Sequence, residues 1–271
     1  MVASVQELLQ LLELEDIDTD VLLGKAPSTS LQRVFGGQVL AQALAAAART
    51  VVERAPHSLH GYFLRPGDPD RPIVYLVERV RDGRSFTTRR VVARQHGLPI
   101  FHMTASFQIA ERGLEHQAPM PGAPAPTGLP TLRDRLVDQG RRAAADEWGV
   151  LDVRYATETL DVQRVWMRTS EPLPDDPLVH ACVLAYASDL TLLGTALRPH
   201  RLAFDHPSLI SASIDHALWF HRPVRMDEWV LYDQDTPSAS GGRGLARGQL
   251  FTAQGDLCAS TVQEGLMRVA R

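Results

Sequence analysis

The second half of this 271-residue chain repeats the pattern of the first half. Three pairs of segments share residues at matching positions: SLHGYFLRP at 58–66 with DHALWFHRP at 215–223, RQHGLPIFHMTASFQ at 94–108 with TAQGDLCASTVQ at 252–263, and LAQAL at 40–44 with LAYAS at 184–188. A spacing of about 150 residues is too long for a solenoid repeat, whose units run about 20–50 residues. The chain is therefore predicted to contain a duplicated domain.

The first half is predicted to be helical and then β-stranded. Ser4 and Glu7 have the spacing of a capping box, so a short helix is expected after Ser4. A second helix is expected from the Phe35-Gly36-Gly37 stretch through residue 54, because its many alanines permit close packing on a sheet. Four strand-like runs follow, at 57–66, 72–83, 84–97 and 98–109, with hairpin turns at Asp82-Gly83 and His96-Gly97.

The second half follows the same order. Asp176 is a suitable N-cap and Pro177 a suitable first residue for its helix. Strands are expected at 159–169 before that helix and at 211–223, 227–242, 243–255 and 256–269 after it. Between the halves, residues 117–130 contain five prolines and two glycines and are predicted as a linker, followed by a charged helical stretch over 132–148. The expected division is 1–116, 117–150 and 151–271.

Composition excludes several classes of protein. With 44% hydrophobic and 22% charged residues the chain has the balance of a globular protein. Its net charge of −4 provides no general basic field for nucleic acid. Cys182 and Cys258 offer neither a disulfide framework nor a CxxC metal pair. The N-terminal segment is acidic and lacks the pattern of a signal peptide. We therefore expect a cytoplasmic protein.

One carboxylate stands inside an apolar segment. Residues 178–197 are long enough to cross a bilayer, yet they contain Asp189, His180 and several hydroxyls without flanking basic anchors, so they are predicted as a buried helix with no membrane insertion. A lone buried carboxylate costs several kcal/mol unless it is hydrogen-bonded, paired or neutralised. The repeat alignment sets Ala45 opposite Asp189, so packing alone does not demand the acid. Asp189 is a candidate functional residue.

Six segments, in order, resemble the hallmarks of a known family: VFGGQVLAQAL, HSLHGYFLRPGD, VRDGRSF, PIFHMTASFQ, SIDHALWFHRP and ASTVQEGLMR. They are similar to the type II acyl-CoA thioesterases, the TesB family, over almost the whole chain outside 117–150. The resemblance implies an α+β double hotdog fold, in which a long helix lies on a curved antiparallel sheet twice in one chain. It also implies hydrolysis of fatty acyl-CoA to fatty acid and CoA, no metal or other cofactor, and a homodimer or larger homo-oligomer.

The resemblance assigns catalysis to Asp189, Ser213 and Gln263. The family position of Ser213 more commonly holds Thr, and losing that methyl group keeps the hydroxyl but loosens its rotamer. Burial raises the pKa of a carboxyl group, so Asp189 suits the role of general base for an attacking water. Ser213 and Gln263 both donate and accept hydrogen bonds, so they suit the role of holding that water.

The sequence marks residues that would contact the substrate less clearly than the catalytic residues. Gly36 and Gly37 would let a thioester approach the backbone N–H groups at a helix N-terminus, where an oxyanion could be stabilised. The phosphates of CoA should meet arginines, and five candidates stand near strand ends and turns: Arg65, Arg84, Arg89, Arg90 and Arg222.

The sequence also allows other interpretations of these residues. A Ser213–His216–Asp189 triad lacks the GxSxG pattern, and residues three apart on one strand should point to opposite faces. HSLH at 57–60 alone is too little for zinc, which needs three or four ligands. A non-catalytic acyl-CoA binding or sensing protein and a hotdog dehydratase or hydratase are the two remaining alternatives; the latter chemistry usually pairs a His with an acid.

Overall fold

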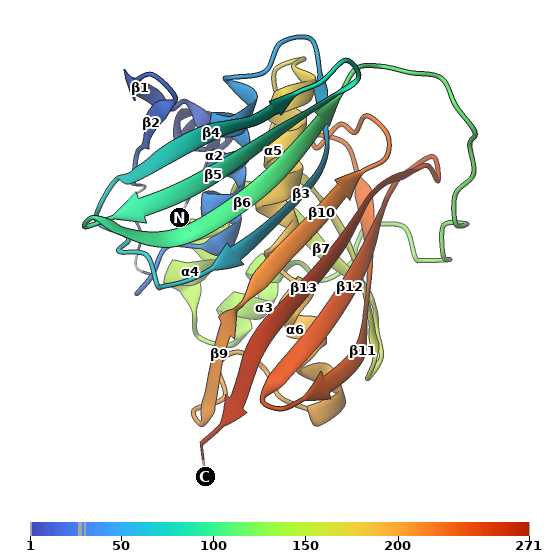
Figure 1. Ribbon diagram of the computed structural model, residues 1–271. Coiled ribbons are helices and arrows are strands. Elements are labelled where there is room, and N and C mark those ends of the chain that lie inside the picture. The colour runs from blue at the N-terminus through green and yellow to red at the C-terminus, as the bar shows by residue number, and fades with distance from the viewer. Residues whose placement is uncertain (1, 27–28, 30, 271) are drawn as a thin grey trace.

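A computed structural model describes residues 2–26, 29 and 31–270 of the chain. Its described strands form one thirteen-stranded antiparallel sheet, in the order β1-β2-β4-β5-β6-β3-β10-β13-β12-β11-β8-β7, with β9 paired to β13 (Figure 1). The strands are β1 (Glu15–Asp18), β2 (Val21–Gly24), β3 (Ala55–Phe63), β4 (Ile73–Asp82), β5 (Phe86–Gln95), β6 (Leu98–Gln108), β7 (Leu151–Glu158), β8 (Val162–Thr169), β9 (Leu209–Ser213), β10 (Asp215–Phe220), β11 (Val230–Ser240), β12 (Arg243–Thr252) and β13 (Leu257–Val269).

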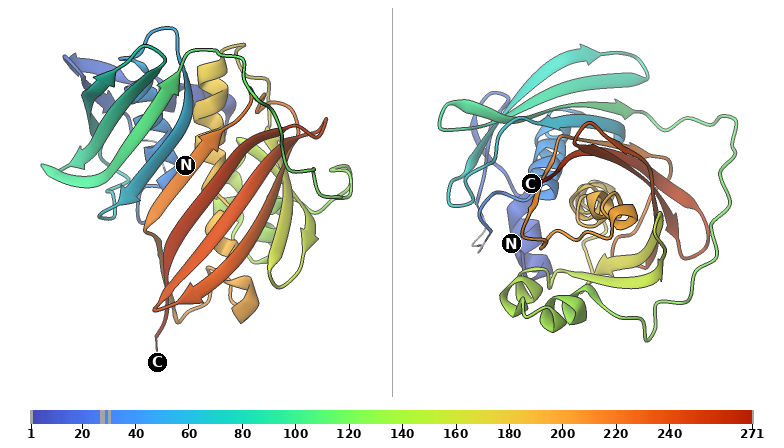
Figure 2. Two further views of the ribbon diagram at one scale, coloured as in Figure 1. Left: turned by 45° about the vertical axis from the view of Figure 1, so that its right-hand side comes forward. Right: turned by 90° about the horizontal axis from the view of Figure 1, so that it is seen from below.

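The helices lie mainly on the concave side of this sheet. They are α1 (Val5–Leu12), α2 (Gly36–Ala48), α3 (Leu132–Asp138), α4 (Arg142–Glu147), α5 (Pro177–Ser188) and α6 (Leu192–Thr195), followed by the short 3₁₀ turn η1 (Arg198–His200). Seen from below, the C-terminal strands curve around α5 and α6 (Figure 2). Helix α5 is almost wholly apolar because it is enclosed on all sides, from His180 to Ser188.

The two halves of the sheet join at strands β3 and β10. These strands pair antiparallel, with Leu59 opposite Leu218, and they contain most of the two aligned segments, 58–66 and 215–223. Each half then continues outward from its own central strand. The two segments that the repeat alignment equates therefore occupy equivalent places on either side of the junction.

Several predicted local signals are confirmed. The Ser4 side chain caps α1 by accepting from the N–H of Glu7, and Asp176 caps α5 by accepting from the N–H of Leu178. His96 and Gly97 both have positive φ, 49° and 76°, and join β5 to β6 as a two-residue hairpin turn. These boundaries follow from short-range hydrogen bonds and backbone preference, which the sequence displays directly.

Several predictions about elements need correction. Helix α2 ends at Ala48, six residues before the predicted end, and the predicted strand at 211–223 is split between β9 and β10. Strands β1, β2 and β7 were not predicted. Strand β1 is the polar sequence EDID, exposed throughout, so it has no alternation to recognise. The charged stretch at 132–148 forms two short helices, α3 and α4, instead of one.

The Pro-rich segment after β6 is docked on the protein and is not a free linker. It runs around the outside of the C-terminal sheet (Figure 2). The indole N–H of Trp166 donates to the carbonyl of Pro124 at 2.8 Å, and Gln117 bonds both the carbonyl of Gly255 and the N–H of Leu257. Met120 and Leu129 pack on a small apolar cluster around Trp166. Prolines suit this segment because it is extended and needs few backbone donors.

The apolar segment predicted as one helix is broken. The segment Pro177–His200 is long and apolar enough to span a membrane by length and composition, but 72% of an 18-residue apolar stretch within it is buried in the fold. Helix α5 ends at Ser188, and a turn separates it from α6. The segment is a pair of core elements, and its break places Asp189 at a helix end.

Helices α2 and α5 approach each other closely at Gly37. A Cβ on Gly37 would lie 2.3 Å from the carbonyl oxygen of Tyr186 and 2.5 Å from the ring of Phe35. Real Cβ atoms do not come so close to backbone, so residue 37 has to be glycine for the N-terminus of α2 to meet the last turn of α5. This contact is made between the two halves of the chain.

Gly37→Ala should therefore destabilise the protein, by about 1–3 kcal/mol, because the helices must separate. Helix propensity alone would favour alanine by up to about 1 kcal/mol. A decrease in the free energy of unfolding would therefore reflect the close approach of the two helices. Urea unfolding measures it. Gly113→Ala is the matched control, since no heavy atom lies within 4 Å of its Cβ position. Equal stability of both variants would show that a side chain at residue 37 does not separate the helices.

Candidate active site

Asp189 lies at the C-cap of α5, not in the middle of a helix as the sequence predicted. Its backbone is still helical (φ −83°, ψ −12°), but the chain turns away directly afterwards. The side chain is only 5% exposed. The carboxylate therefore leaves the helix at its last turn and points into a nearly dry space between the two halves.

Gln263 connects the three residues that the sequence assigned to catalysis. Its amide Nε2 donates to Oδ1 of Asp189 at 2.5 Å and to Oγ of Ser213 at 3.0 Å. The two hydrogens of one amide group are thus shared between an acid and a hydroxyl. Because Ser213 accepts from Gln263, its own hydrogen stays available for another acceptor. The Oε1 atom of Gln263 is buried and has no partner among the described residues.

Gly36 and Gly37 complete this arrangement from α2. The backbone N–H of Gly37 donates a hydrogen bond to Asp189, so the positive end of the α2 dipole faces the carboxylate. A Cβ on Gly36 would lie 2.6 Å from Oδ2 of Asp189, so only glycine leaves that oxygen uncovered from this side. The sequence predicted this pair as a substrate contact; its observed contact is with the acid itself.

A bulge brings Ser213 and His216 to the same acid. From Ser213 to Ala217 the chain advances four residues, while its partner β13 advances only three, from Gly265 to Val262. The extra residue shifts the alternation of side chains. The expectation that Ser213 and His216 point to opposite faces assumed one regular strand and is therefore wrong. His216 Nδ1 lies 3.7 Å from Oδ1 of Asp189.

The last turn of α5 is held by buried polar side chains, of which the sequence pointed only to His216. The Ser188 hydroxyl donates to the carbonyl of Ala185 at 2.9 Å and lies 2.9 Å from Nε2 of His216. The Tyr232 hydroxyl donates to the carbonyl of Ser188 at 3.1 Å. Nothing in the spacing of these residues reveals the cluster, because each comes from a different element.

Burial controls the electrostatics of the site. Desolvation raises the pKa of Asp189 from 3.8 to about 7, although the hydrogen bonds from Gln263 and from the Gly37 N–H act in the opposite direction. Desolvation also lowers the pKa of His216 to about 3, so its ring is neutral. At neutral pH the site therefore holds a carboxyl group that gains and loses a proton easily, beside an uncharged imidazole.

The arginine candidates separate into two groups. Arg89 is 1% exposed, and its guanidinium is fully used by Asp82, Thr50 and backbone carbonyls, so its prediction as a CoA contact is wrong. Arg90 pairs with Glu78 at 3.6 Å on the sheet surface. The other three keep exposed or half-buried side chains at loops, and within the described chain none bonds to Asp189, Ser213 or Gln263: Arg65, Arg84 and Arg222.

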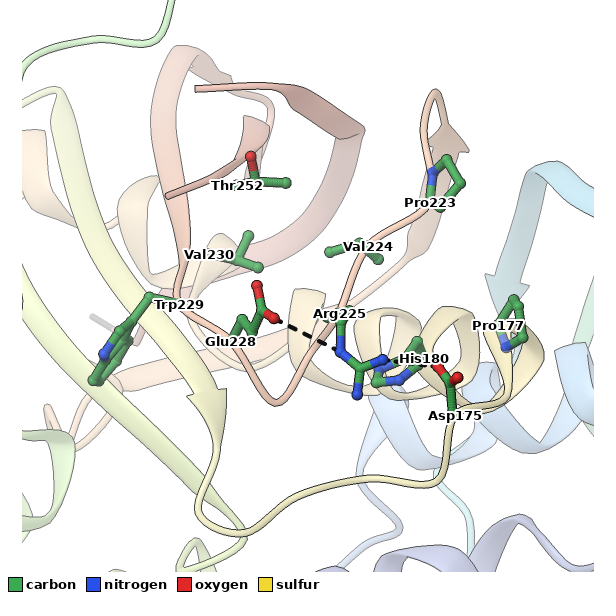
Figure 3. Close-up of a pocket in the computed structure, with 10 residues that line it drawn as sticks. All are labelled: Asp175, Pro177, His180, Pro223, Val224, Arg225, Glu228, Trp229, Val230 and Thr252. Carbon is green, nitrogen blue, oxygen red and sulfur yellow. Dashed lines mark hydrogen bonds and ion pairs between the residues drawn. The ribbon is translucent and has the colours of Figure 1, made fainter. Parts of the chain in front are cut away.

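A separate pocket of about 270 Å³ lies at the opposite end of α5, beside His180 (Figure 3). Arg225 lines this pocket, and its guanidinium group forms ion pairs with the carboxylates of Asp175, Asp227 and Glu228. This pocket therefore offers no free cation for a phosphate. His180 and Asp189 stand at the two ends of one helix, so the pocket is distinct from the carboxylate site.

The histidines of HSLH are occupied by protein partners. His57 Nε2 lies 2.8 Å from the Ser106 hydroxyl, and His60 Nε2 lies 3.0 Å from Oδ2 of Asp215. Across the described residues, no group of three or more His, Cys, Asp or Glu side chains is arranged to hold a metal ion.

Known proteins resemble this chain over nearly its full length. A family profile described as acyl-CoA thioesterase matches residues 135–266, and one described as acyl-CoA thioesterase N-terminal domain matches 25–108. "Acyl-CoA thioesterase 2" of Haemophilus influenzae is 40% identical, covering 97% of this chain and 98% of the relative. The crystal structure of an acyl-CoA thioesterase II, TesB2, from Mycobacterium marinum is 47% identical with a TM-score of 0.85, covering 97% of this chain and 98% of that one.

The predicted double hotdog fold is confirmed by these comparisons. A protein of unknown function with a hot dog fold from Alicyclobacillus acidocaldarius shares only 23% identity, yet it superimposes with a TM-score of 0.80 over 97% of this chain and 98% of that chain. At this level of identity the match concerns the fold alone. The two central helices and the single wrapped sheet are the features in common with that architecture.

The raised pKa of Asp189 predicts a specific dependence of stability on pH. The folded state holds the proton up to about pH 7, whereas the unfolded chain releases it near 3.8. The free energy of unfolding should therefore fall as pH rises between these values, by up to about 1.4 kcal/mol per unit. Relative to Asp189→Asn, which cannot titrate, the wild type should lose about 2.5 kcal/mol between pH 5 and pH 8. Urea unfolding at several pH values tests this; a constant difference would contradict it.

Proposed function

Because the chain belongs to the type II acyl-CoA thioesterase family, we propose that Asp189, Ser213 and Gln263 are the residues with which it hydrolyses fatty acyl-CoA thioesters. The chain is an acyl-CoA thioester hydrolase by its family. The observation that supports the residue assignment is the pair of hydrogen bonds from one Gln263 amide to both Asp189 and Ser213. Neither a metal ion nor another cofactor is needed for the reaction in this form.

Asp189 acts as the general base in this proposal. A pKa of about 7 lets the carboxylate take a proton from water at neutral pH and return it later without a large barrier in either direction. The water oxygen forms a bond to the thioester carbon while its proton moves to Asp189. When the carbon–sulfur bond breaks, that proton passes to the departing sulfur of CoA, and the products are fatty acid and CoA.

Ser213 and Gln263 serve to direct the water. Since Gln263 donates to the Ser213 oxygen, the serine hydrogen can donate to the water oxygen. A water that donates to Asp189 and accepts from Ser213 has its remaining lone pair aimed in one direction. Such positioning lowers the entropic part of the barrier. Gly36 lets the thioester approach Oδ2 of Asp189, where any side chain would intrude.

Two alternative activities fit these contacts less well. A non-catalytic acyl-CoA binding protein would have no reason to keep a buried acid of raised pKa beside a polarised hydroxyl. A hotdog dehydratase would use a His–acid pair, and His216 does lie 3.7 Å from Asp189. The His216 ring, however, is fully buried, and its second nitrogen faces Ser188, so the imidazole has no face that a substrate can reach.

Two broader expectations stay proposals. Composition supports a cytoplasmic location, and resemblance to the family supports a homodimer or larger homo-oligomer.

Arg65, Arg84 and Arg222 are kept as proposed contacts for the phosphates of CoA. Of these, Arg65 lies two residues after Phe63, whose ring lies 3.0 Å from the Cβ position of Gly36.

Asp189→Asn should abolish at least 99% of thioester hydrolysis, because the amide keeps the shape of the side chain but cannot accept the proton. Release of CoA from acyl-CoAs of short to long chain, followed with a thiol reagent, measures the loss. Asp205→Asn, in the loop before β9, controls for the loss of one negative charge. Lack of CoA release by the wild type at every chain length would favour the binding protein, and enoyl or hydroxyacyl products would favour the dehydratase.

Ser213→Ala should lower kcat about 10- to 100-fold with a smaller change in KM, because the water loses a donor while substrate contacts stay. Ser213→Thr retains the hydroxyl and should retain most activity. Ser211→Ala, two residues earlier on β9, is the control for an alanine on the same strand. Equal kinetics for Ser213→Ala and Ser211→Ala would make Ser213 a structural residue.

A further inference from the structure

His216 is a buried imidazole with one nitrogen unused. The residue is 0% exposed, and its Nδ1 is buried without a hydrogen-bond partner among the described residues. A buried polar atom left without a partner costs about 1–3 kcal/mol, so native proteins rarely keep one without a role. The nearest charged group is Asp189, whose Oδ1 lies 3.7 Å away.

The hydrogen bonds of Ser188 bear on the tautomer of His216. The Ser188 oxygen lies 2.9 Å from the carbonyl oxygen of Ala185, which can only accept, and 2.9 Å from Nε2 of His216. When Ser188 donates its single hydroxyl hydrogen to Ala185, the Ser188 oxygen accepts from Nε2. The ring is neutral, since burial lowers the pKa of His216 to about 3. In that arrangement Nε2 carries the hydrogen, and Nδ1 presents a bare lone pair.

That lone pair faces the carboxyl group of Asp189. Against an ionised carboxylate it is unfavourable, because two acceptors meet in a low-dielectric space. Against a protonated carboxyl group it is favourable, because an O–H···N hydrogen bond can form when the side chains move together by less than an ångström. The arrangement therefore discriminates between the two protonation states of one acid.

Few other ionisable groups surround this pair. His60, on β3, influences His216 and is itself bonded to Asp215 at the start of β10. Tyr232, on β11, is the buried phenol near Asp189, and its hydroxyl lies 2.8 Å from Thr261. Helix α2 has no charged residue, and neither do β9 and α6. On β13, Glu264 next to Gln263 pairs with Arg243 at 2.9 Å.

We propose that His216 is a positioning residue that accepts a hydrogen bond from protonated Asp189 through Nδ1, and so sets the pH range in which Asp189 works as a base. This inference rests on the proposed function, since it concerns the same acid. His216 itself touches no substrate. Ser188 is the second member of the device, because its occupied hydroxyl keeps the hydrogen of the ring on Nε2.

Asp189 is the only side chain that carries the transferred proton in this proposal. Water gives its proton to the carboxylate as the oxygen–carbon bond forms, and the resulting O–H turns toward Nδ1 of His216. The same proton then moves to the sulfur as the carbon–sulfur bond breaks, which restores the carboxylate. The imidazole is never protonated, in agreement with its lowered pKa.

Two amide variants separate the two nitrogens of the ring. His216→Gln can keep a donor for Ser188 but has no acceptor at the Nδ1 position, whereas His216→Asn can keep an acceptor near Nδ1 and loses the donor to Ser188. We expect the acid limb of kcat/KM against pH to move down by about 0.5–1 unit in His216→Gln, because the ionised form of Asp189 is no longer opposed. In His216→Asn the limb should stay within about 0.2 unit. Equal shifts in both variants, or none in either, would overturn the proposal.

Ser188→Ala provides an independent test through the tautomer. Without the serine oxygen the ring hydrogen can move to Nδ1 and donate to the carboxylate, which should also shift the acid limb to lower pH. ¹⁵N NMR of wild-type protein labelled at histidine reads the tautomer directly, with the His216 signals assigned by their loss in His216→Gln. A protonated Nδ1 in the wild type would overturn the proposal even if the variants fail to fold.

The failure of this inference can be told apart from failure of the proposed function. If the wild type releases CoA and Asp189→Asn does not, the function stands whatever the His216 variants do. If no CoA is released, the pKa of Asp189 can still be followed by ¹³C NMR of its carboxyl carbon in wild type and His216→Gln. A pKa that is unchanged between those two proteins sinks the inference alone.

Discussion

Helix α2 meets the end of α5 at Gly37, where the carbonyl of Tyr186 occupies the space of a missing side chain. The α2 side of the candidate site depends on this contact. It brings the N–H of Gly37 to Asp189 and leaves Oδ2 uncovered at Gly36, and it does so between the two halves of the chain. A duplicated fold thus gains a site that neither half contains, since the acid comes from one copy and its helix-terminal donor from the other.

Breaks in regular structure place the remaining groups. Helix α5 stops at Ser188, so Asp189 leaves the helix axis, and a bulge between β9 and β10 turns both Ser213 and His216 toward it. Regular elements would have separated these side chains, because alternation along one strand sends residues three apart to opposite faces. The irregular residues are surrounded by a well-packed apolar core, which holds them in fixed positions.

The site also shows how burial is balanced against hydrogen bonding. Desolvation is the largest influence on Asp189, and Gln263 and Gly37 offset only part of it, so the pKa settles near neutrality instead of at either extreme. A carboxylate whose desolvation was fully offset by hydrogen bonds would be a weak base, and a buried carboxylate without such hydrogen bonds would stay protonated. The free energy that the fold loses by ionising Asp189 is tolerated because the enclosing sheet and helices bury a large apolar core.

Local signals determined much of the fold from the sequence alone. The caps at Ser4 and Asp176 and the His96-Gly97 turn depend on neighbours a few residues apart. The repeated segments indicated the duplication, and the motifs carried the resemblance that named Asp189, Ser213 and Gln263. The tertiary structure alone decided the rest: the helix end at Asp189, the approach of Gly37, the docked Pro-rich segment and the position of His216. These depend on contacts between residues far apart in the chain and on a single extra residue in one strand, and no short-range periodicity encodes either of them.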